Sequence, residues 1–151
     1  MKYRSDFVTN SSSSSFIVAM KNKAEYNNMK LWMCDNYPEY AIRVFNDIES
    51  SKMTYTEALE YFKKRVTWIV RCYILYEMPE YKYKDIDWRR SDEYKQLEKK
   101  MIEEKIAEFK AKLPKRGYIS VVTYGSDTGE PELEQYVMPN LPFVIEVIDG
   151  H

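Results

Sequence analysis

Hydrophobic residues follow a helical period in the middle of the chain and a strand-like pattern near both ends. Apolar positions recur every three or four residues across 54–77 and again across 91–113. This spacing is typical of helices with one face against a core. Thr54 and Glu57 have the spacing of a capping box, in which each side chain covers a free backbone donor at a helix start. We therefore expect two long helices.

Two shorter helices are predicted before them, over 23–35 and 38–49. Pro38 favours the start of the second, because proline lacks the N–H that a first helical turn leaves unpaired. Residues 78–90 show no period and are expected to connect the two long helices.

Three short segments rich in β-branched and aromatic residues predict strands at 16–20, 118–124 and 143–148. Residues 132–138 fit either a short strand or a helical turn. Because a lone strand cannot satisfy its backbone, we expect the first strand to pair with the C-terminal ones.

The order of these elements predicts a single α+β domain over 1–151, with a polar N-terminal arm at 1–15. Its sheet is expected to be small, three- to four-stranded and mainly antiparallel. It would be built from the N-terminal and C-terminal segments, with about four helices from the middle packed on one face. The sequence has no apolar run of about 18 residues and no apolar signal-peptide core, so we expect a cytoplasmic protein without a membrane partner.

Charge is distributed unevenly along the chain although the net charge is -1. Residues 1–116 hold all 23 Lys and Arg against 18 acids, whereas 117–151 hold six acids and no base. Either the two charge blocks pair within the fold, which we favour, or the acidic block forms a face for a basic partner. Cys34 and Cys72 show neither metal-ligand nor disulfide-framework spacing, so we expect buried or half-buried thiols.

The N-terminal string F-V-T-N-S-S-S-S-S-F, over residues 7–16, is distinctive. It resembles the opening of a loose set of small proteins from bacteria and their phages, which typically begin F-V-[ST]-N-S-S-S-S-S-F. The resemblance covers about a tenth of the chain and implies a bacterial or phage origin. It implies no activity and assigns no role to any residue.

Four roles are open for the serine run. It is a solvated lead-in to the sheet, an anion site formed by hydroxyls and backbone N–H groups with Arg4 nearby, a processing or modification site, or a partner contact. We favour the lead-in, because phosphate-binding loops are normally rich in glycine and open a helix. The residues of the ligand-binding alternative are Arg4, Asn10, Ser11, Ser12, Ser13, Ser14 and Ser15.

Catalytic chemistry has little support in the sequence. His151 is the only histidine and the last residue, where chains usually fray. Acidic residues over 127–134 suggest an Mg²⁺ or Ca²⁺ site, but their order does not fit an EF-hand loop, and we favour a solvated turn. Neither a Walker motif nor G-x-G-x-x-G is present. We expect no catalytic residue, no metal site and no cofactor.

Aromatic residues favour recognition instead. The chain has 14 Tyr, and Tyr and Trp give a large contact area at low entropic cost. We expect Tyr37, Tyr40 and Tyr76 to be exposed near helix ends. The predicted connection mixes aromatic with basic residues and supplies the predicted interaction residues Tyr81, Tyr83, Trp88, Arg89 and Arg90.

A binding function therefore ranks first among the hypotheses. Basic residues among aromatics also suit nucleic acid, but the pI of about 6.0 makes that partner unlikely. We expect a non-enzymatic protein that contacts another protein or its own copy. The first alternative is a small-ligand or phosphate-binding protein that uses the serine run, and a less favoured one is a metal-dependent enzyme that uses the acidic loop.

Overall fold

The computed structural model describes residues 13–81, 84 and 87–149. Three strands form one antiparallel sheet in the order β2-β1-β3. Their bounds are Ser13–Met20 for β1, Tyr118–Gly125 for β2 and Val144–Asp149 for β3. The N-terminal strand therefore lies at the centre, between two strands from the C-terminal part. The predicted α+β fold is confirmed.

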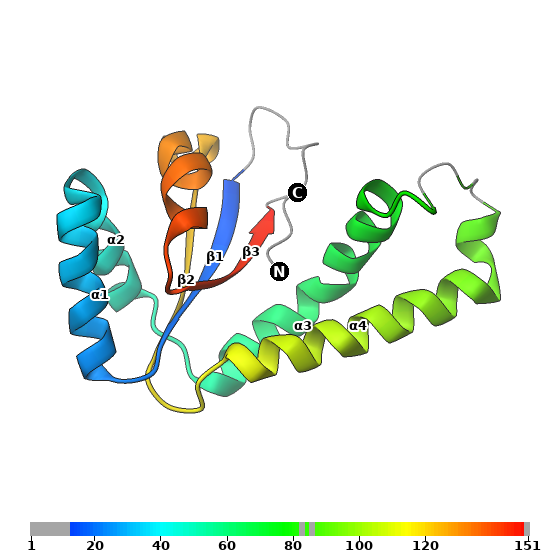
Figure 1. The fold of residues 1–151 in the computed structure, drawn as a ribbon, viewed down its shortest axis with the longest axis horizontal. Coiled ribbons are helices and arrows are strands. Elements are labelled where there is room, and N and C mark those ends of the chain that lie inside the picture. The colour runs from blue at the N-terminus through cyan, green and yellow to red at the C-terminus, as the bar shows by residue number, and fades with distance from the viewer. Residues whose placement is uncertain (1–12, 82–83, 85–86, 150–151) are drawn as a thin grey trace.

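Four α-helices and several single turns complete the fold (Figure 1). The helices are α1 (Lys23–Asn36), α2 (Pro38–Ser50), α3 (Tyr55–Cys72) and α4 (Asp92–Lys112). The π-helical turns are η1 (Tyr73–Glu77) and η4 (Leu133–Val137), and the 3-10 turns are η2 (Trp88–Arg90), η3 (Ser126–Thr128) and η5 (Met138–Asn140). Both long helices are thus where the hydrophobic period predicts them, and the ambiguous segment at 132–138 is helical.

Hydrogen bonds at the helix starts explain where α3 and α4 begin. The Glu57 N–H donates to Thr54 Oγ1, and the Thr54 N–H donates to Glu57 Oε1, each over 3.1 Å. The predicted capping box is confirmed. At α4, the Tyr94 N–H donates to Ser91 Oγ over 3.2 Å. Cys34, in contrast to expectation, is exposed on α1, while Cys72 is half-buried.

Helices cover both faces of the sheet, so the expectation of helices on one face is wrong. Phe16 and Val18 of β1 pack with α1 and α2, whereas Ile17 packs with α3 and α4. The reason is visible in the sequence: residues 16–20 are all apolar, and a strand that is apolar on both sides needs cover on both. Figure 1 shows the sheet between the α1–α2 pair and the α3–α4 pair.

The first strand also begins earlier than predicted. It starts at Ser13, so the last three serines belong to the sheet rather than to the N-terminal arm. Ser14 pairs with Tyr124 on one side and with Asp149 on the other. Pairing on both sides satisfies the backbone groups of Ser14 and Ser15, which overrides the weak strand propensity of serine.

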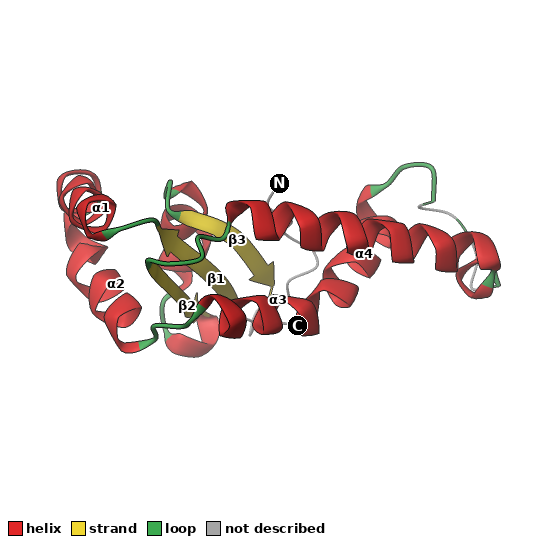
Figure 2. Ribbon diagram, turned by 90° about the horizontal axis from the view of Figure 1, so that it is seen from below, coloured by secondary structure: helices red, strands yellow, loops and turns green. Residues whose placement is uncertain are grey.

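Helices α3 and α4 form an antiparallel hairpin, which we call the α3–α4 hairpin. Only the start of α3 and the end of α4 lie against the sheet, at β2 and β3 respectively. Figure 2 shows the rest of both helices extending beyond the sheet, so that the far half of the hairpin packs mainly on itself.

Gly117 is required by the connection from α4 to β2. Its φ is +131°, and an added Cβ would lie 2.4 Å from the Met20 carbonyl oxygen. We expect Gly117→Ala to lower the free energy of unfolding by about 2 kcal/mol, through backbone strain and displacement of β1. Gly129→Ala is the matched control, because Gly129 has φ +74° and open space around it. Urea unfolding that shows equal losses for the two variants would contradict the role of the close approach.

Candidate interaction surface on the α3–α4 hairpin

A buried aromatic stack holds the base of the hairpin together. The rings of Phe62 on α3 and Phe109 on α4 lie 4.1 Å apart and nearly parallel, and both side chains are buried. Phe62 follows Ala58 and precedes Val66 at helical spacing, which places these side chains on one face of α3. This face packs on Ile17 of the sheet. The sheet therefore supports the hairpin at its base.

Aromatic residues also close the far end of the hairpin. Tyr81 stacks on Trp88 at 4.8 Å, and Trp88 meets the edge of Tyr94 at 5.3 Å. Tyr94 is buried, and Tyr81 and Trp88 pack against the same core cluster. Two of the predicted interaction residues thus lie within the packing of the hairpin end, and their part in binding a partner stays a prediction.

The remaining predicted interaction residues are placed differently. Arg89 and Arg90 are exposed on η2, next to the start of α4. Tyr83 lies outside the described residues. Among the other tyrosines expected to be exposed, Tyr76 is 47% exposed, while Tyr37 and Tyr40 are half-buried.

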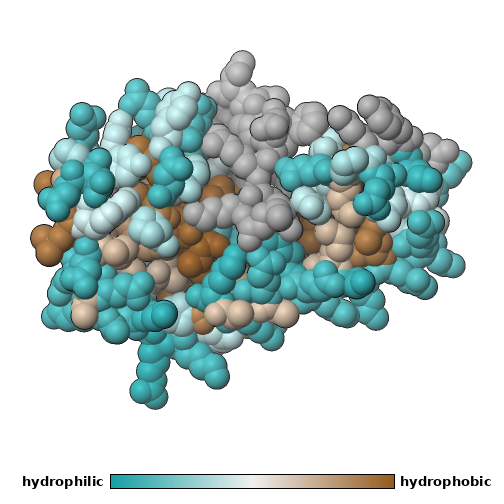
Figure 3. Space-filling model, in the orientation of Figure 1, coloured by the Kyte–Doolittle hydropathy of each residue, from teal (hydrophilic) through white to brown (hydrophobic). Residues whose placement is uncertain are grey.

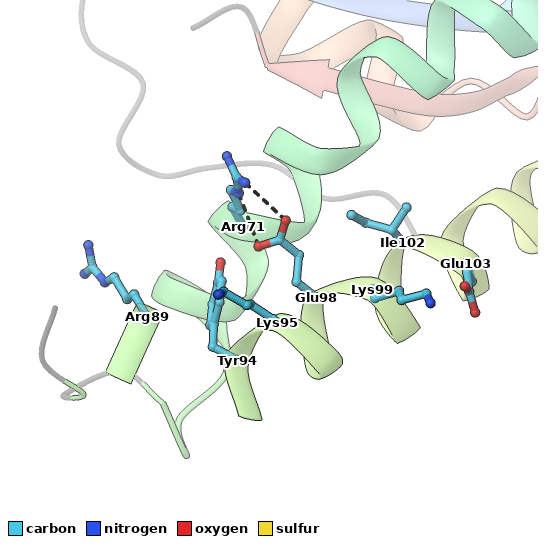
Figure 4. Close-up of a pocket in the computed structure, with 8 residues that line it drawn as sticks. All are labelled: Arg71, Arg89, Tyr94, Lys95, Glu98, Lys99, Ile102 and Glu103. Atoms are coloured by element: carbon cyan, nitrogen blue, oxygen red, sulfur yellow. Dashed lines mark hydrogen bonds and ion pairs between the residues drawn. The ribbon is translucent and has the colours of Figure 1, made fainter. Parts of the chain in front are cut away.

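A pocket of about 480 Å³ lies where η2 and the start of α4 approach the end of α3 (Figure 4). Its wall along α4 is a row of residues one helical turn apart, beginning at Tyr94 and ending at Ile102. A second, exposed row beside it carries lysines. The lining residues are Arg71, Arg89, Tyr94, Lys95, Glu98, Lys99, Ile102 and Glu103.

One ion pair occupies the α3 side of this pocket. Two guanidinium nitrogens of Arg71 contact the Glu98 carboxylate, Nε at 3.3 Å and Nη2 at 3.2 Å. The carboxylate raises the pKa of Arg71, while burial and the nearby Glu98 raise the pKa of the Tyr94 hydroxyl. Tyr94 therefore lines the pocket as a neutral phenol.

Three further basic residues line the pocket, and unlike Arg71 they are not held in an ion pair with any described residue. Within the part of the chain that the structure describes, Arg89, Lys95 and Lys99 make no ion pair with any carboxylate. Glu98 is already bound by Arg71, so no ion pair between described residues neutralises these three cations.

Exposed apolar side chains add to the hairpin surface. Trp68 on α3 is 51% exposed and Tyr76 on η1 is 47% exposed. Figure 3 shows apolar side chains between α3 and α4, surrounded by polar ones. Trp68 is absent from the predicted interaction residues, although one signal was present: it is a tryptophan outside the core-facing positions of a strongly periodic helix. Leu31, Ile42 and Tyr136 are exposed on other elements.

The described serines of the N-terminal run are bound within the fold. Ser14 is buried, and its hydroxyl donates to Glu134 Oε2 over 2.9 Å. Ser15 Oγ lies 3.0 Å from Thr123 Oγ1 on the neighbouring strand. A carboxylate next to Ser14 repels an anion, which is unfavourable for a phosphate site here. Arg4, Asn10, Ser11 and Ser12 of the proposed anion site lie outside the described residues, and the site stays a prediction.

Ser14→Ala tests the structural role of the run. The variant leaves the buried Glu134 without this donor, and we expect a loss of about 1–2 kcal/mol in the free energy of unfolding. Ser15→Ala removes a hydroxyl pair at a more accessible position, and we expect a loss below about 0.5 kcal/mol. Chemical denaturation in which the two variants lose equal stability would contradict the assigned role of Ser14.

Acidic residues of the C-terminal part are separated by the fold. Glu130 pairs with Arg43 at 2.8 Å, and Glu132 accepts a 2.6 Å hydrogen bond from the Tyr40 hydroxyl. Glu134 is buried beside Ser14. No cluster of three His, Cys, Asp or Glu side chains suited to a metal occurs over the described ranges. Pairing of Glu130 with Arg43 agrees with the favoured expectation that the charge blocks pair within the fold.

A buried ion pair joins α4 to the sheet. Lys105 Nζ lies 3.7 Å from Glu146 Oε1 and 4.0 Å from Glu108 Oε1. The side chains of Lys105 and Glu146 are only 5% and 2% exposed. Burial lowers the pKa of Lys105 and raises the pKa of Glu146, since the interior disfavours either charge. This pair also joins the two charge blocks, and it lies near the base of the hairpin.

Comparison of the chain with protein-family models, with curated proteins and with solved structures gave no match. None of the helices described is both long enough and apolar enough to cross a membrane. The assignment of a function therefore depends on the geometry and chemistry of the surfaces above.

Proposed function

We propose that the protein is a non-enzymatic binding protein, of bacterial or phage origin and cytoplasmic, which contacts another protein or its own copy through the α3–α4 hairpin. The observation that supports this most is the exposure of Trp68 and Tyr76 on a helix that extends beyond the sheet. Tryptophan and tyrosine supply most of the binding energy at many protein interfaces, because they bury a large area with few rotamers to fix.

The spacing of aromatic and basic residues along α3 and η1 supports a role of the hairpin in binding. Trp68 and Tyr76 are eight residues apart, so their side chains lie about 12 Å apart along the helix axis. Arg71 lies between them in sequence and faces the pocket. Interfaces combine aromatic residues and arginine in this way, with an apolar centre and a charged rim.

Other exposed apolar residues give weaker support for an interface. Leu31, Ile42 and Tyr136 lie on separate elements, α1, α2 and η4 respectively. Singly exposed apolar residues are common on protein surfaces and need no partner. The hairpin differs because it carries a concave, charged pocket in addition to two exposed aromatic residues.

Affinity purification from the host cell tests the proposal. Tagged wild-type protein is compared by quantitative mass spectrometry with Trp68→Ser/Tyr76→Ser and with the matched control Leu31→Ser/Ile42→Ser. Each double variant removes two exposed apolar side chains, so folding is affected little in either. We expect partner recovery, or recovery of a second untagged copy, to fall at least tenfold for the hairpin variant only, since an interface aromatic residue typically contributes more than 1 kcal/mol. Equal recovery with the wild type and the hairpin variant would contradict the proposal.

A further inference from the structure

The pocket of Figure 4 is lined by more basic than acidic side chains. Four of its eight lining residues are Arg or Lys and two are Glu. Arg71 and Glu98 neutralise one another. Arg89, Lys95 and Lys99 thus face one remaining acid, Glu103, which is exposed on the outer row of α4.

We propose that this pocket binds acidic side chains of the protein partner, and that it thereby selects an acidic segment rather than any apolar one. The inference rests on the proposed function, since it names the chemistry of the partner that the α3–α4 hairpin contacts. Complementary charge across an interface raises the association rate and excludes partners with the wrong charge.

The spacing of the cations fits two neighbouring carboxylates. Lys95 and Lys99 are one turn apart on α4, so their side chains start about 6 Å apart. Acidic residues one turn apart on a partner helix, or two residues apart on an extended segment, have nearly the same separation. Arg89 reaches the same pocket from η2 and supplies a third, planar donor group.

The apolar parts of the pocket favour a peptide over a nucleic acid. Ile102 and Tyr94 both line the pocket, and the side chain of Tyr94 is buried. These groups suit the methylene portions of acidic side chains. A nucleic acid needs a longer track of cations that follows successive phosphates, and Glu98 and Glu103 interrupt any such track along α4.

Binding of defined probe peptides tests the inference. The probe is a fluorescein-labelled nine-residue peptide of eight Glu and one Trp, and its counterpart has Gln in place of Glu. Affinities for the full-length protein are measured by fluorescence anisotropy at low salt. The pocket variant is Lys95→Gln/Lys99→Gln. Its matched control is Lys110→Gln/Lys115→Gln, which removes two exposed lysines that do not line the pocket. The two double variants have the same net charge.

We expect the acidic peptide to bind at least tenfold more tightly than its Gln counterpart. The pocket variant should weaken that binding about threefold to tenfold, because it loses two exposed ion pairs with the peptide. The control variant should weaken it less than about twofold. Amide NMR shifts on addition of the acidic peptide should be largest for 94–103.

Three outcomes would overturn the inference: no binding of the acidic peptide, equal weakening by the two double variants, or tighter binding of a single-stranded oligonucleotide of the same charge. The purification experiment separates this failure from failure of the proposed function. If the partner is still lost with Trp68→Ser/Tyr76→Ser while the acidic peptide does not bind, the hairpin is the interface and its partner is not acidic.

Discussion

Phe109→Ala is expected to lower the free energy of unfolding by about 4 kcal/mol. Phe109 is 1% exposed, and its ring stacks on Phe62 at 4.1 Å, so truncation leaves a cavity between α3 and α4. The lost burial and the cavity both contribute to the cost. A domain of this size is typically stable by about 5–15 kcal/mol, so the variant should lose a large part of its stability.

Urea denaturation followed by far-UV circular dichroism measures this effect. Phe109→Leu is the control, because leucine keeps most of the apolar volume, and we expect it to lose no more than about 1.5 kcal/mol. A loss below about 1 kcal/mol for Phe109→Ala would show that the hairpin base is not packed as described.

Lys105→Met is expected to lower the free energy of unfolding by about 3–5 kcal/mol at neutral pH. The substitution leaves the Glu146 carboxylate buried without its closest cation, which lies 3.7 Å away in the wild type. No donor within the described part of the chain hydrogen-bonds Glu146 Oε1, so no hydrogen bond to this oxygen offsets the loss. Lys100→Met, at an exposed position on the same helix, should cost less than about 0.5 kcal/mol.

The double variant Lys105→Met/Glu146→Leu separates the charge from the packing. Replacing both members of a buried ion pair by apolar side chains is often neutral or stabilising. We therefore expect the double variant to be at least about 2 kcal/mol more stable than Lys105→Met. A double variant as unstable as the single one would contradict the assigned pairing.

The buried carboxyl of Glu146 makes the free energy of unfolding depend on pH. Burial raises the pKa of Glu146 above the ordinary value of 4.5, so the folded state binds the proton more tightly than the unfolded state. The contribution of Glu146 to stability is present at low pH and is lost as the pH rises through the raised folded-state pKa. Relative to Lys105→Met/Glu146→Leu, the wild type should lose stability as the pH rises from about 4.5. An unchanged difference between the two proteins across this range would contradict the burial of Glu146.

Local patterns in the sequence were sufficient to predict the elements. The capping box at Thr54 and Glu57, the position of Pro38 and the helical period of the apolar residues all depend on residues close in sequence. The strand positions followed from short apolar runs of β-branched residues. The pairing of the first strand with the C-terminal strands also followed, since it had no others to pair with, whereas its central place between them is a finding of the structure.

Contacts between distant residues account for what the sequence did not predict. Ser14 is 120 residues from Glu134, and nothing near the serine run indicates that a carboxylate covers it. Lys105 and Glu146 have the pattern of surface charges, and only the packing of α4 on β3 buries them. The extension of the hairpin beyond the sheet depends on which ends of α3 and α4 pack on β2 and β3, which periodicity alone does not give.

The sequence predicts the exposure of the candidate interaction residues only in part, for a related reason. Arg89 and Arg90 were recognised from basic residues among aromatics, and both are exposed. Tyr81 and Trp88 belonged to the same pattern, but their rings stack on each other at the end of the hairpin. Composition shows that aromatic residues are abundant, whereas tertiary packing decides which of them remain accessible.

Photo-crosslinking in the host cell tests most directly whether the α3–α4 hairpin contacts a partner. A benzophenone amino acid is placed at position 68, and at position 42 on α2 as the control, because both native side chains are exposed. Contact through the hairpin predicts a covalent adduct of defined mass from position 68 and none from position 42. Adducts from position 42 alone, or from neither position, would contradict it.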